Sequence, residues 1–300
     1  MRLSTSLAIE INDKGKIRKI PAEDSLRAVA NAGYRYCDVP IYSYVQMDGP
    51  LADSDWEKWA HSFRDLAESL DIKFSQSHAY FYPNIFLDKN GTYSEPNFDE
   101  YHRRSVLASE IFGVKWMVMH PSTWPGNDGN ADYAKSFGYN KDYFSRWGDL
   151  ASKHKVGIAI ENMWHPVDRK KGYCVVSEEL VELVDALNDP LIQICVDVGH
   201  IPLYELNIVS YIRSVGGRLK ATHIHDNHGS SRGMGHEADE HIMPFQGSIQ
   251  WEEVMDVLKN VNYEQDFTFE VHQLTKYFPA NLIAPLIDFS YILGEYLFSL

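Results

Sequence analysis

The chain has 300 residues, of which 44% are apolar and 13% aromatic, so it can bury a large core and is not expected to be disordered. Its 42 acidic residues outnumber its 28 lysines and arginines, and the formal net charge of −14 repels polyanions. We therefore expect neither nucleic acid nor a membrane surface among its partners. The three cysteines are too few for a disulfide framework, and the first residues lack the long apolar run of a signal peptide. Both features favour a cytoplasmic location.

Short apolar or alternating runs predict eight β-strands along the chain. They are expected at residues 3–9, 34–40, 72–78, 116–121, 156–162, 192–198, 219–226 and 267–272. Helical patterns lie between them and are clear at 54–70, 98–112 and 177–187. Eight strand–helix repeats over this length predict an α/β fold, a single-domain (β/α)8 TIM barrel over residues 1–300. An open, doubly wound sheet is the alternative, but no GxGxxG motif or phosphate-binding loop supports it.

The segment 282–300 is the most apolar part of the sequence. Pro285, Asp288 and Glu295 interrupt it, which favours a packed amphipathic helix over a membrane span. Such a helix can also cover a subunit interface, so a homo-oligomer is an open expectation.

Polar residues gather at the predicted strand ends. The stretch ICVDVGH, residues 194–200, begins as a buried strand and ends with Asp197 and His200. A buried ionised carboxylate is costly unless it is paired or binds a metal. Six predicted strands end in a residue type that binds metals: His78, His120, Glu161, Asp197, one of His223 and His225, and Glu270.

These strand ends should converge, because the C-terminal ends of all strands of a TIM barrel meet on one face. Singly, each residue has a structural explanation, such as a hydrogen-bonded core histidine or an aspartate that caps a helix. Together, the carboxylates would repel one another and take up protons unless a cation lay among them. The pattern therefore predicts a divalent-metal site. Alternation along the strand places His223 and His225 on the same side and does not choose between them.

Seven segments carry a resemblance to a known family: SQSHAY, HPS, IEN, CVDVGH, HIHDN, DEHIMPFQG and FEVH. In this order they resemble the xylose isomerase-like TIM barrel superfamily, which includes sugar-phosphate isomerases and epimerases, ketose 3-epimerases, inosose dehydratases and endonuclease IV. The resemblance implies a metal site made of Glu161, Asp197, His223 and Glu270, and it selects His223 over His225. It further implies that His200 contacts substrate, as in the epimerase branch, or binds metal, as in the endonuclease branch.

A second set of residues resembles the additional ligands of the three-zinc endonuclease site. It comprises His78, His120, His200, Asp239 and His241. Members of the sugar-isomerase branch also carry a similar DxH segment followed by a glycine-containing turn and a tryptophan. We therefore interpret this set as additional metal-binding or substrate-binding residues, not as a sign of DNA chemistry.

The leading interpretation is a divalent-metal-dependent isomerase or epimerase of a small sugar or polyol derivative. Glu161 and Glu270 would be the catalytic acid and base, moving a proton through a metal-stabilised enediolate. Tyr80, Phe81, Trp124 and Trp164 are expected to pack on the C–H faces of the carbohydrate. A dehydratase of the same superfamily stays open, and the absence of a glycine-rich phosphate cradle favours a non-phosphorylated substrate.

Two other functions compete with this interpretation. An endonuclease IV-like multi-zinc phosphodiesterase acting on abasic DNA would use the same ligands, but the net charge and the lack of a basic groove argue against it. A binding module without catalysis is disfavoured by the intact acids. Three carboxylates and one imidazole suit Mn²⁺, Mg²⁺ or Co²⁺, whereas the larger histidine-rich set would favour Zn²⁺.

Overall fold

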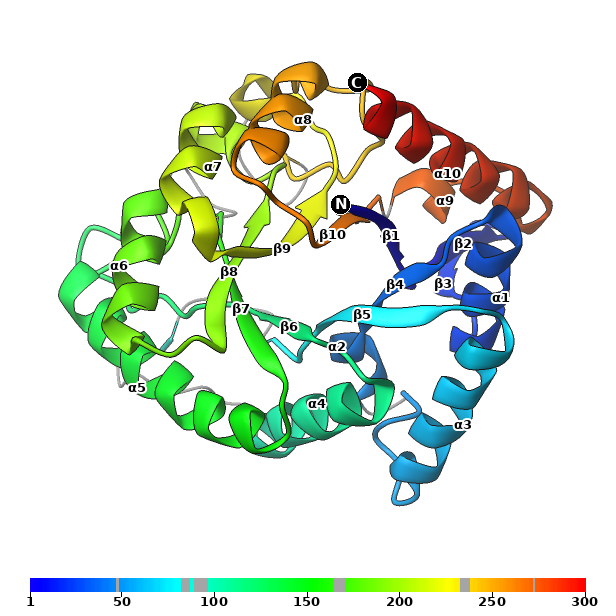
Figure 1. Cartoon of the computed structure of the whole chain (residues 1–300), viewed down its shortest axis with the longest axis horizontal. Helices are drawn as coiled ribbons and strands as arrows, with labels where there is room; N and C mark the ends of the chain where they lie inside the picture. The colour runs from blue at the N-terminus through cyan, green and yellow to red at the C-terminus, as the bar shows by residue number, and fades with distance from the viewer. Residues whose placement is uncertain (47–48, 82–86, 89–96, 165–170, 233–237, 272) are drawn as a thin grey trace.

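Eight parallel strands close into a barrel in the order β1-β10-β9-β8-β7-β6-β5-β4 (Figure 1). The computed structural model describes residues 1–46, 49–81, 87–88, 97–164, 171–232, 238–271 and 273–300. The barrel strands are β1 (Arg2–Ser6), β4 (Tyr36–Pro40), β5 (Lys73–His78), β6 (Trp116–Met119), β7 (Gly157–Glu161), β8 (Ile192–Asp197), β9 (Leu219–Ile224) and β10 (Asp266–Phe269). Each coincides with a predicted strand, and the predicted (β/α)8 barrel is confirmed.

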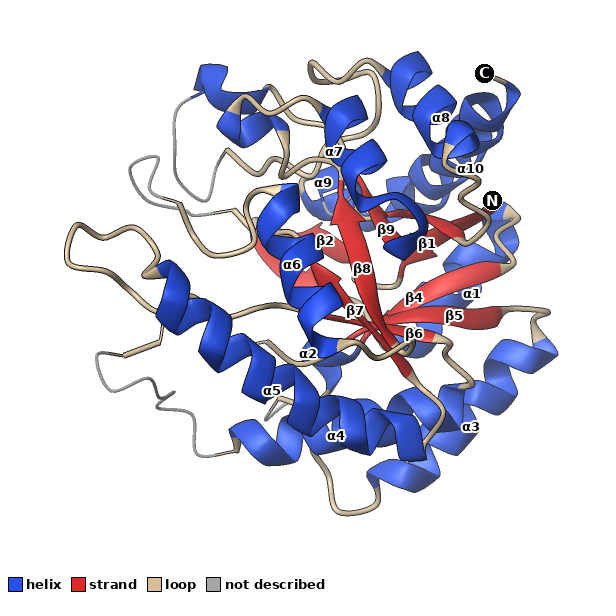
Figure 2. Ribbon diagram, turned by 60° about the vertical axis from the view of Figure 1, so that its left-hand side comes forward, coloured by secondary structure: helices blue, strands red, loops and turns tan. Residues whose placement is uncertain are grey.

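Helices surround the barrel on its outside (Figure 2). They are α1 (Ala22–Ala32), α2 (Ile41–Tyr44), α3 (Trp56–Ser69), α4 (Phe98–Phe112), α5 (Tyr133–Lys153), α6 (Ser177–Leu187), α7 (Ile208–Val215), α8 (Trp251–Asn260), α9 (Gln273–Lys276) and α10 (Ile283–Ser299). Short 3-10 helices are η1 (Pro202–Tyr204), η2 (Gly216–Arg218), η3 (Gly229–Arg232) and η4 (Ala280–Leu282). The three helices predicted at 54–70, 98–112 and 177–187 are confirmed as α3, α4 and α6.

A hairpin follows β1 that the sequence patterns did not predict. Its strands, β2 (Glu10–Asp13) and β3 (Lys16–Lys19), pair antiparallel with Asp13 opposite Lys16. The two-residue turn is Lys14–Gly15, with φ of 54° and 86°. Positive φ at both positions is typical of the type I′ turns that match the twist of paired strands.

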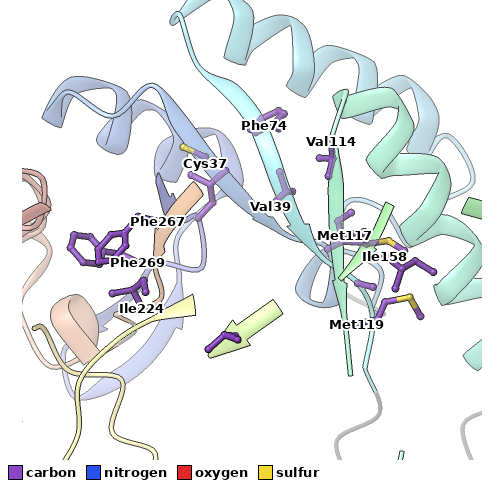
Figure 3. Packing of buried hydrophobic residues seen from close by; sticks show 14 of the residues in the cluster. Cys37, Val39, Phe74, Val114, Met117, Met119, Ile158, Ile224, Phe267 and Phe269 are labelled. Atoms are coloured by element: carbon purple, nitrogen blue, oxygen red, sulfur yellow. The ribbon is translucent and has the colours of Figure 1, made fainter. Parts of the chain in front are cut away.

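The core has two layers because side chains alternate along each strand. Outward-facing residues such as Met117, Ile158 and Phe267 pack beneath the helices (Figure 3). A smaller buried cluster comprises Trp116, Val118, Ala159, Cys195 and Ala221. The alternation gives these residues the same strand sides as Glu161, Asp197 and His223. Trp116 and the smaller side chains of this cluster therefore lie inside the barrel, and the polar residues lie above them at its mouth.

The last helix, α10, packs against β1, α1 and α8, as expected for the apolar C-terminal segment. Ala280–Ser299 is long and apolar enough to cross a membrane by length and composition alone. Within it, 28% of the 18-residue stretch that meets this criterion is buried. Phe289, Ile292 and Tyr296 are 50%, 64% and 51% exposed and form an apolar outer face of the helix. A homo-oligomer that covers this face stays a prediction.

Gly157 at the start of β7 should not tolerate a side chain. An added Cβ would come within 2.4 Å of Trp116 Cε3 and 3.1 Å of the Lys115 carbonyl oxygen. We expect Gly157→Ala to destabilise the fold by about 1–3 kcal/mol through overpacking, measured as a lower thermal midpoint. Gly138→Ala inside α5 is the matched control, because a Cβ there meets nothing within 4 Å. The control should stabilise by about 0.5–1 kcal/mol through helix propensity, and equal effects of the two substitutions would contradict this account.

Candidate metal and active site

Glu161 lies at the centre of the barrel mouth, at the end of β7, and is 1% exposed. Its Oε1 is 3.1 Å from His223 Nδ1, and its Oε2 is 3.0 Å from His120 Nε2 and 3.4 Å from His78 Nε2. The Nε2 atoms of His78 and His120 are themselves 3.0 Å apart. The ends of β5, β6, β7 and β9 thus converge on one carboxylate, as the barrel geometry predicts.

His223 faces all three carboxylates of the predicted metal site. Its Nδ1 is 3.1 Å from Glu161 Oε1, 3.4 Å from Glu270 Oε2 and 3.9 Å from Asp197 Oδ2. The structure therefore brings together Glu161, Asp197, His223 and Glu270. His225 points the same way along β9 but faces Asp197 and Asp239, at 3.0 and 3.6 Å from its Nε2.

A second group surrounds Asp239, which enters from the loop before α8. Asp239 Oδ2 is 2.8 Å from His241 Nε2 and 3.6 Å from His200 Nε2. The ring of His225 stacks on that of His241, with centroids 4.0 Å apart. All of the additional residues predicted from the resemblance, His78, His120, His200, Asp239 and His241, thus lie beside the four central ones.

Backbone carbonyls set the orientation of three of these imidazoles. His78 Nδ1 donates to the Ala79 carbonyl at 3.0 Å, His200 Nδ1 to Asn162 at 2.8 Å, and His241 Nδ1 to Glu270 at 2.7 Å. A carbonyl oxygen only accepts, so each Nδ1 carries a proton and each Nε2 faces a carboxylate. Either a second proton or a cation has to lie between each Nε2 and the carboxylate that it faces. Metal-binding histidines commonly donate their other ring nitrogen in this way.

The donor set fits a divalent cation. Four groups of three residues each bring a ligand atom within 4.8 Å of the others: His78–Glu161–His223, Asp197–His223–Glu270, Asp197–His200–His225 and His225–Asp239–His241. Asp239 Oδ1 is buried and has no hydrogen-bond partner among the residues that the structure describes. A buried carboxylate oxygen without a donor is costly, and a cation would remove that cost.

Electrostatics within the cluster favour the ionised form of Glu161 and Asp197 and the protonated form of His200, His223 and His241 when no cation is bound. Burial alone would raise the pKa of Glu161, but His223 and His120 outweigh burial and hold it well below its ordinary value. Burial lowers the pKa of His200, yet Asp197 and Asp239 raise it to about 10. The imidazoles with raised pKa values thus carry protons that a bound cation would displace.

Two polar residues that the sequence reasoning missed hold the ligand segments in place. Asn162 accepts from the backbone N–H of Asp197 at 2.7 Å and donates to its carbonyl at 2.9 Å. Asp226 accepts from Trp251 Nε1 at 2.9 Å and from the backbone N–H groups of Phe245 and Ile249 at 3.0 and 3.2 Å. These bonds anchor the loop that follows Asp239. Asn162 lies in the segment IEN and Asp226 in the segment HIHDN, both of which carried the family resemblance.

Of the aromatic residues predicted to contact substrate, Trp164 lies beside the cluster, with its ring 6.2 Å from that of His200. The ring of Tyr80 packs against Phe98, Tyr101 and His102 of α4, and Trp124 lies beneath the ammonium of Lys135. The substrate roles of these residues stay predictions.

Phe81, which is among the predicted aromatic residues, and Tyr42, which is not, form an aromatic wall beside the cluster. Phe81 stacks on His120 at 4.6 Å, Tyr42 meets His78 edge-on at 5.2 Å, and the two rings lie 4.9 Å apart. Of the two aromatic residues predicted after β5, Phe81 therefore lies at the cluster, whereas Tyr80 packs against α4.

Comparison with known proteins places the chain among barrels of this kind. A family model described as a xylose isomerase-like TIM barrel matches residues 26–289. The D-psicose 3-epimerase of Enterocloster bolteae is 26% identical over 99 residues, which are 33% of this chain and 29% of that protein. The uncharacterized protein y4fM of Sinorhizobium fredii is 33% identical over 88 residues, 29% of this chain and 26% of that protein. The chain therefore matches less than a third of the length of these relatives.

Solved structures share the whole fold. A D-tagatose 3-epimerase-like protein has a TM-score of 0.71 at 16% identity, covering 100% of this chain and 98% of the other. The IolI protein, solved with a bound zinc atom, has a TM-score of 0.72 at 18% identity, with the same coverage of 100% and 98%. At such identities the likeness shows the fold.

Cation binding should release protons. Burial lowers the pKa of His223, but nearby charges, Glu270 first, outweigh burial and hold it well above its ordinary value. Burial also lowers the pKa of His241, but Asp239 outweighs burial and raises this pKa to about 10. Near neutral pH these two rings are therefore protonated when no cation is bound. An imidazole must lose its second proton before it can bind a metal. The affinity for Co²⁺ should therefore rise with pH until these protons are lost. Calorimetry in buffers of different ionisation enthalpy should show at least about one proton released per cation; binding heats that are independent of buffer would contradict this.

Proposed function

The chain belongs to the xylose isomerase-like TIM barrel family, and from this premise we propose that it is a divalent-metal-dependent isomerase or epimerase of a small sugar or polyol derivative. The observation that carries the proposal is the pair Glu161 and Glu270. These two glutamates come from different strands and lie 3.1 and 3.4 Å from the same nitrogen, His223 Nδ1. Two carboxylates around one ligand group are what a proton transfer between two carbons or two faces of one carbon requires.

Four residues would hold the cation: Glu161, Asp197, His223 and Glu270. The burial of the three acids and the close ligand atoms of His223 with Glu161, Asp197 and Glu270 support this assignment, and the zinc atom in the IolI structure supports a cation in a barrel of this fold. When bound, a divalent cation would polarise a substrate carbonyl and the adjacent hydroxyl and thereby acidify the neighbouring C–H bond. The three carboxylates favour Mn²⁺, Mg²⁺ or Co²⁺. Participation of His78, His120, His200, Asp239 and His241 would shift the preference toward Zn²⁺.

The chain's own acids would move the proton. Glu161 is ionised because its pKa is held well below its ordinary value, chiefly by His223 and His120 against the opposing effect of burial. It therefore carries no proton, as a base must, and efficient proton exchange near neutral pH would need its pKa raised in the substrate complex or coupled to that of Glu270. Glu270, on the other side of His223, would return a proton to the enediolate and restore the carbonyl compound. After one turnover the protonation states of the two acids are exchanged, which suits a reversible isomerisation.

Aromatic rings would bind the rest of the carbohydrate and exclude water. Phe81 and Tyr42 line the His78 and His120 side of the cluster, and Trp164 lies near His200. Flat aromatic surfaces suit the C–H faces of a sugar, while the acids and imidazoles between them suit its hydroxyl groups. No phosphate cradle was found in the sequence, so a non-phosphorylated substrate is part of the proposal.

An endonuclease IV-like activity is not favoured. Its complete ligand set is present, but the net charge of −14 opposes the binding of a phosphate backbone. The match to a D-psicose 3-epimerase and the shared fold with a D-tagatose 3-epimerase-like protein support the carbohydrate function instead. A cytoplasmic location and the lack of nucleic-acid and membrane partners stay predictions.

Proton exchange with solvent tests the proposal. Mn²⁺-loaded protein incubated in D₂O with a panel of ketoses that includes D-fructose, D-psicose and D-tagatose should place deuterium on a carbon next to the carbonyl. Glu161→Gln and Glu270→Gln should each slow this exchange by about 10²–10⁴-fold, because each removes an acid or base. Glu253→Gln on the outer surface of α8 is the control and should leave the rate unchanged. Turnover of a sugar without deuterium gain would favour a hydride shift and contradict the roles of the two glutamates.

A further inference from the structure

His225 is fully buried inside the cation-binding cluster, yet the proposed chemistry gives it no role. Its side chain is 0% exposed and its ring stacks on His241 with centroids 4.0 Å apart. Its Nε2 faces the carboxylates of Asp197 and Asp239. A titratable ring at such a place either binds the cation or orients a residue that does.

Gly199 provides the space for this ring. A Cβ built on Gly199 would lie 2.0 Å from His225 Cε1 and 2.4 Å from its Nδ1. Gly199 is not among the residues with positive φ, so its backbone conformation would accept alanine. The constraint at residue 199 is therefore the imidazole of His225 and not the conformation of the chain.

Hydrogen bonding decides between a ligand and an orienting role. His225 Nε2 lies 3.0 Å from Asp197 Oδ1 and 3.2 Å from Oδ2, whereas its buried Nδ1 has no partner among the residues that the structure describes. A ligand role would need a bare Nε2 and would place the proton on Nδ1, where a buried donor without an acceptor costs about 1–3 kcal/mol. With the proton on Nε2, the ring donates to Asp197 and only a lone pair stays unpaired. The donor form is therefore favoured.

The consequence falls on Asp197. Its Oδ1 lies 2.8 Å from the N–H nitrogen of Gly199, 3.1 Å from that of His200 and 3.0 Å from His225 Nε2. The two backbone N–H groups hold Oδ1, while Oδ2 accepts the hydrogen bond from His225 Nε2 at 3.2 Å and also lies 3.6 Å from His200 Nε2 and 3.9 Å from His223 Nδ1. Outer partners of this kind fix the orientation of a ligating carboxylate.

We propose that His225, seated on Gly199, is a positioning residue that holds Asp197 with its Oδ2 directed into the cation group formed with His223 and Glu270. The inference rests on the proposed function in one respect, that Asp197 binds the cation. It predicts a dependence on residues 199 and 225 although neither touches the cation or the substrate.

The test is the affinity for Co²⁺, measured by calorimetry and by the visible absorption of the bound ion, which reports its coordination independently of turnover. His225→Leu should weaken binding by about 10–100-fold and alter the spectrum without changing the number of ions bound. His225→Gln, whose amide N–H can reach the position of Nε2, should restore the affinity to within about tenfold of the wild type. Circular dichroism and the thermal midpoint check that the variants are folded.

Gly199→Ala extends the test, because its new methyl group would displace the ring of His225 and leave the other side chains near the cation unchanged. It should weaken Co²⁺ binding by a factor similar to that of His225→Leu, and the double variant should bind no more weakly than His225→Leu alone. If His225→Leu fails to fold, comparison of Gly199→Ala with the wild type and His225→Gln carries the test. Full additivity of the two substitutions would overturn the proposal, as would loss of a whole equivalent of Co²⁺ in His225→Leu or wild-type affinity in that variant. A wild-type protein that binds no Co²⁺ would overturn the proposed function itself.

Discussion

The burial of three carboxyl groups at the mouth of the barrel is the constraint on which this structure depends. Glu161 and Asp197 are 1% and 0% exposed, and Glu270 is 8% exposed. Each such charge would cost several kcal/mol if it were left unpaired, and mutual repulsion would add to that cost. Protonated His200, His223 and His241 supply compensating positive charge when no cation is bound, and a divalent cation would supply that charge in place of their protons.

The fold meets this constraint through several layers of support. The parallel strands carry their C-terminal ends to one face, and small side chains such as Ala159 and Ala221 fill the barrel below. Backbone carbonyls orient three imidazoles, Asn162 fixes the turn of Asp197, and Asp226 anchors the loop that follows Asp239. A ligand set collected from many strands is accurate only because these neighbours leave each side chain little freedom.

The sequence was sufficient for the parts that follow from local periodicity and from the topology of a closed barrel. Eight strands and the convergence of Glu161, Asp197 and Glu270 belong to this class, whereas the choice of His223 over His225 rested on the family resemblance. The hairpin β2–β3 escaped because its charged strand KIRK has no apolar alternation, and its pairing depends on the Lys14–Gly15 turn. Tyr80 and Phe81 are both predicted from the sequence to contact substrate, but only the structure shows that the ring of Phe81 lies at the cluster and that of Tyr80 packs against α4. The contact of Gly199 with His225 joins two strands and is visible only in three dimensions.

The central claim is that the strand-end acids and imidazoles are gathered around a divalent cation. Anomalous diffraction from crystals of the wild-type protein grown with Mn²⁺, recorded on both sides of the manganese absorption edge, tests it most directly. The account predicts an anomalous peak within bonding distance of Glu161, Asp197, His223 and Glu270. Crystals that show no peak among these residues, with the carboxylates paired only to the imidazoles, would contradict it.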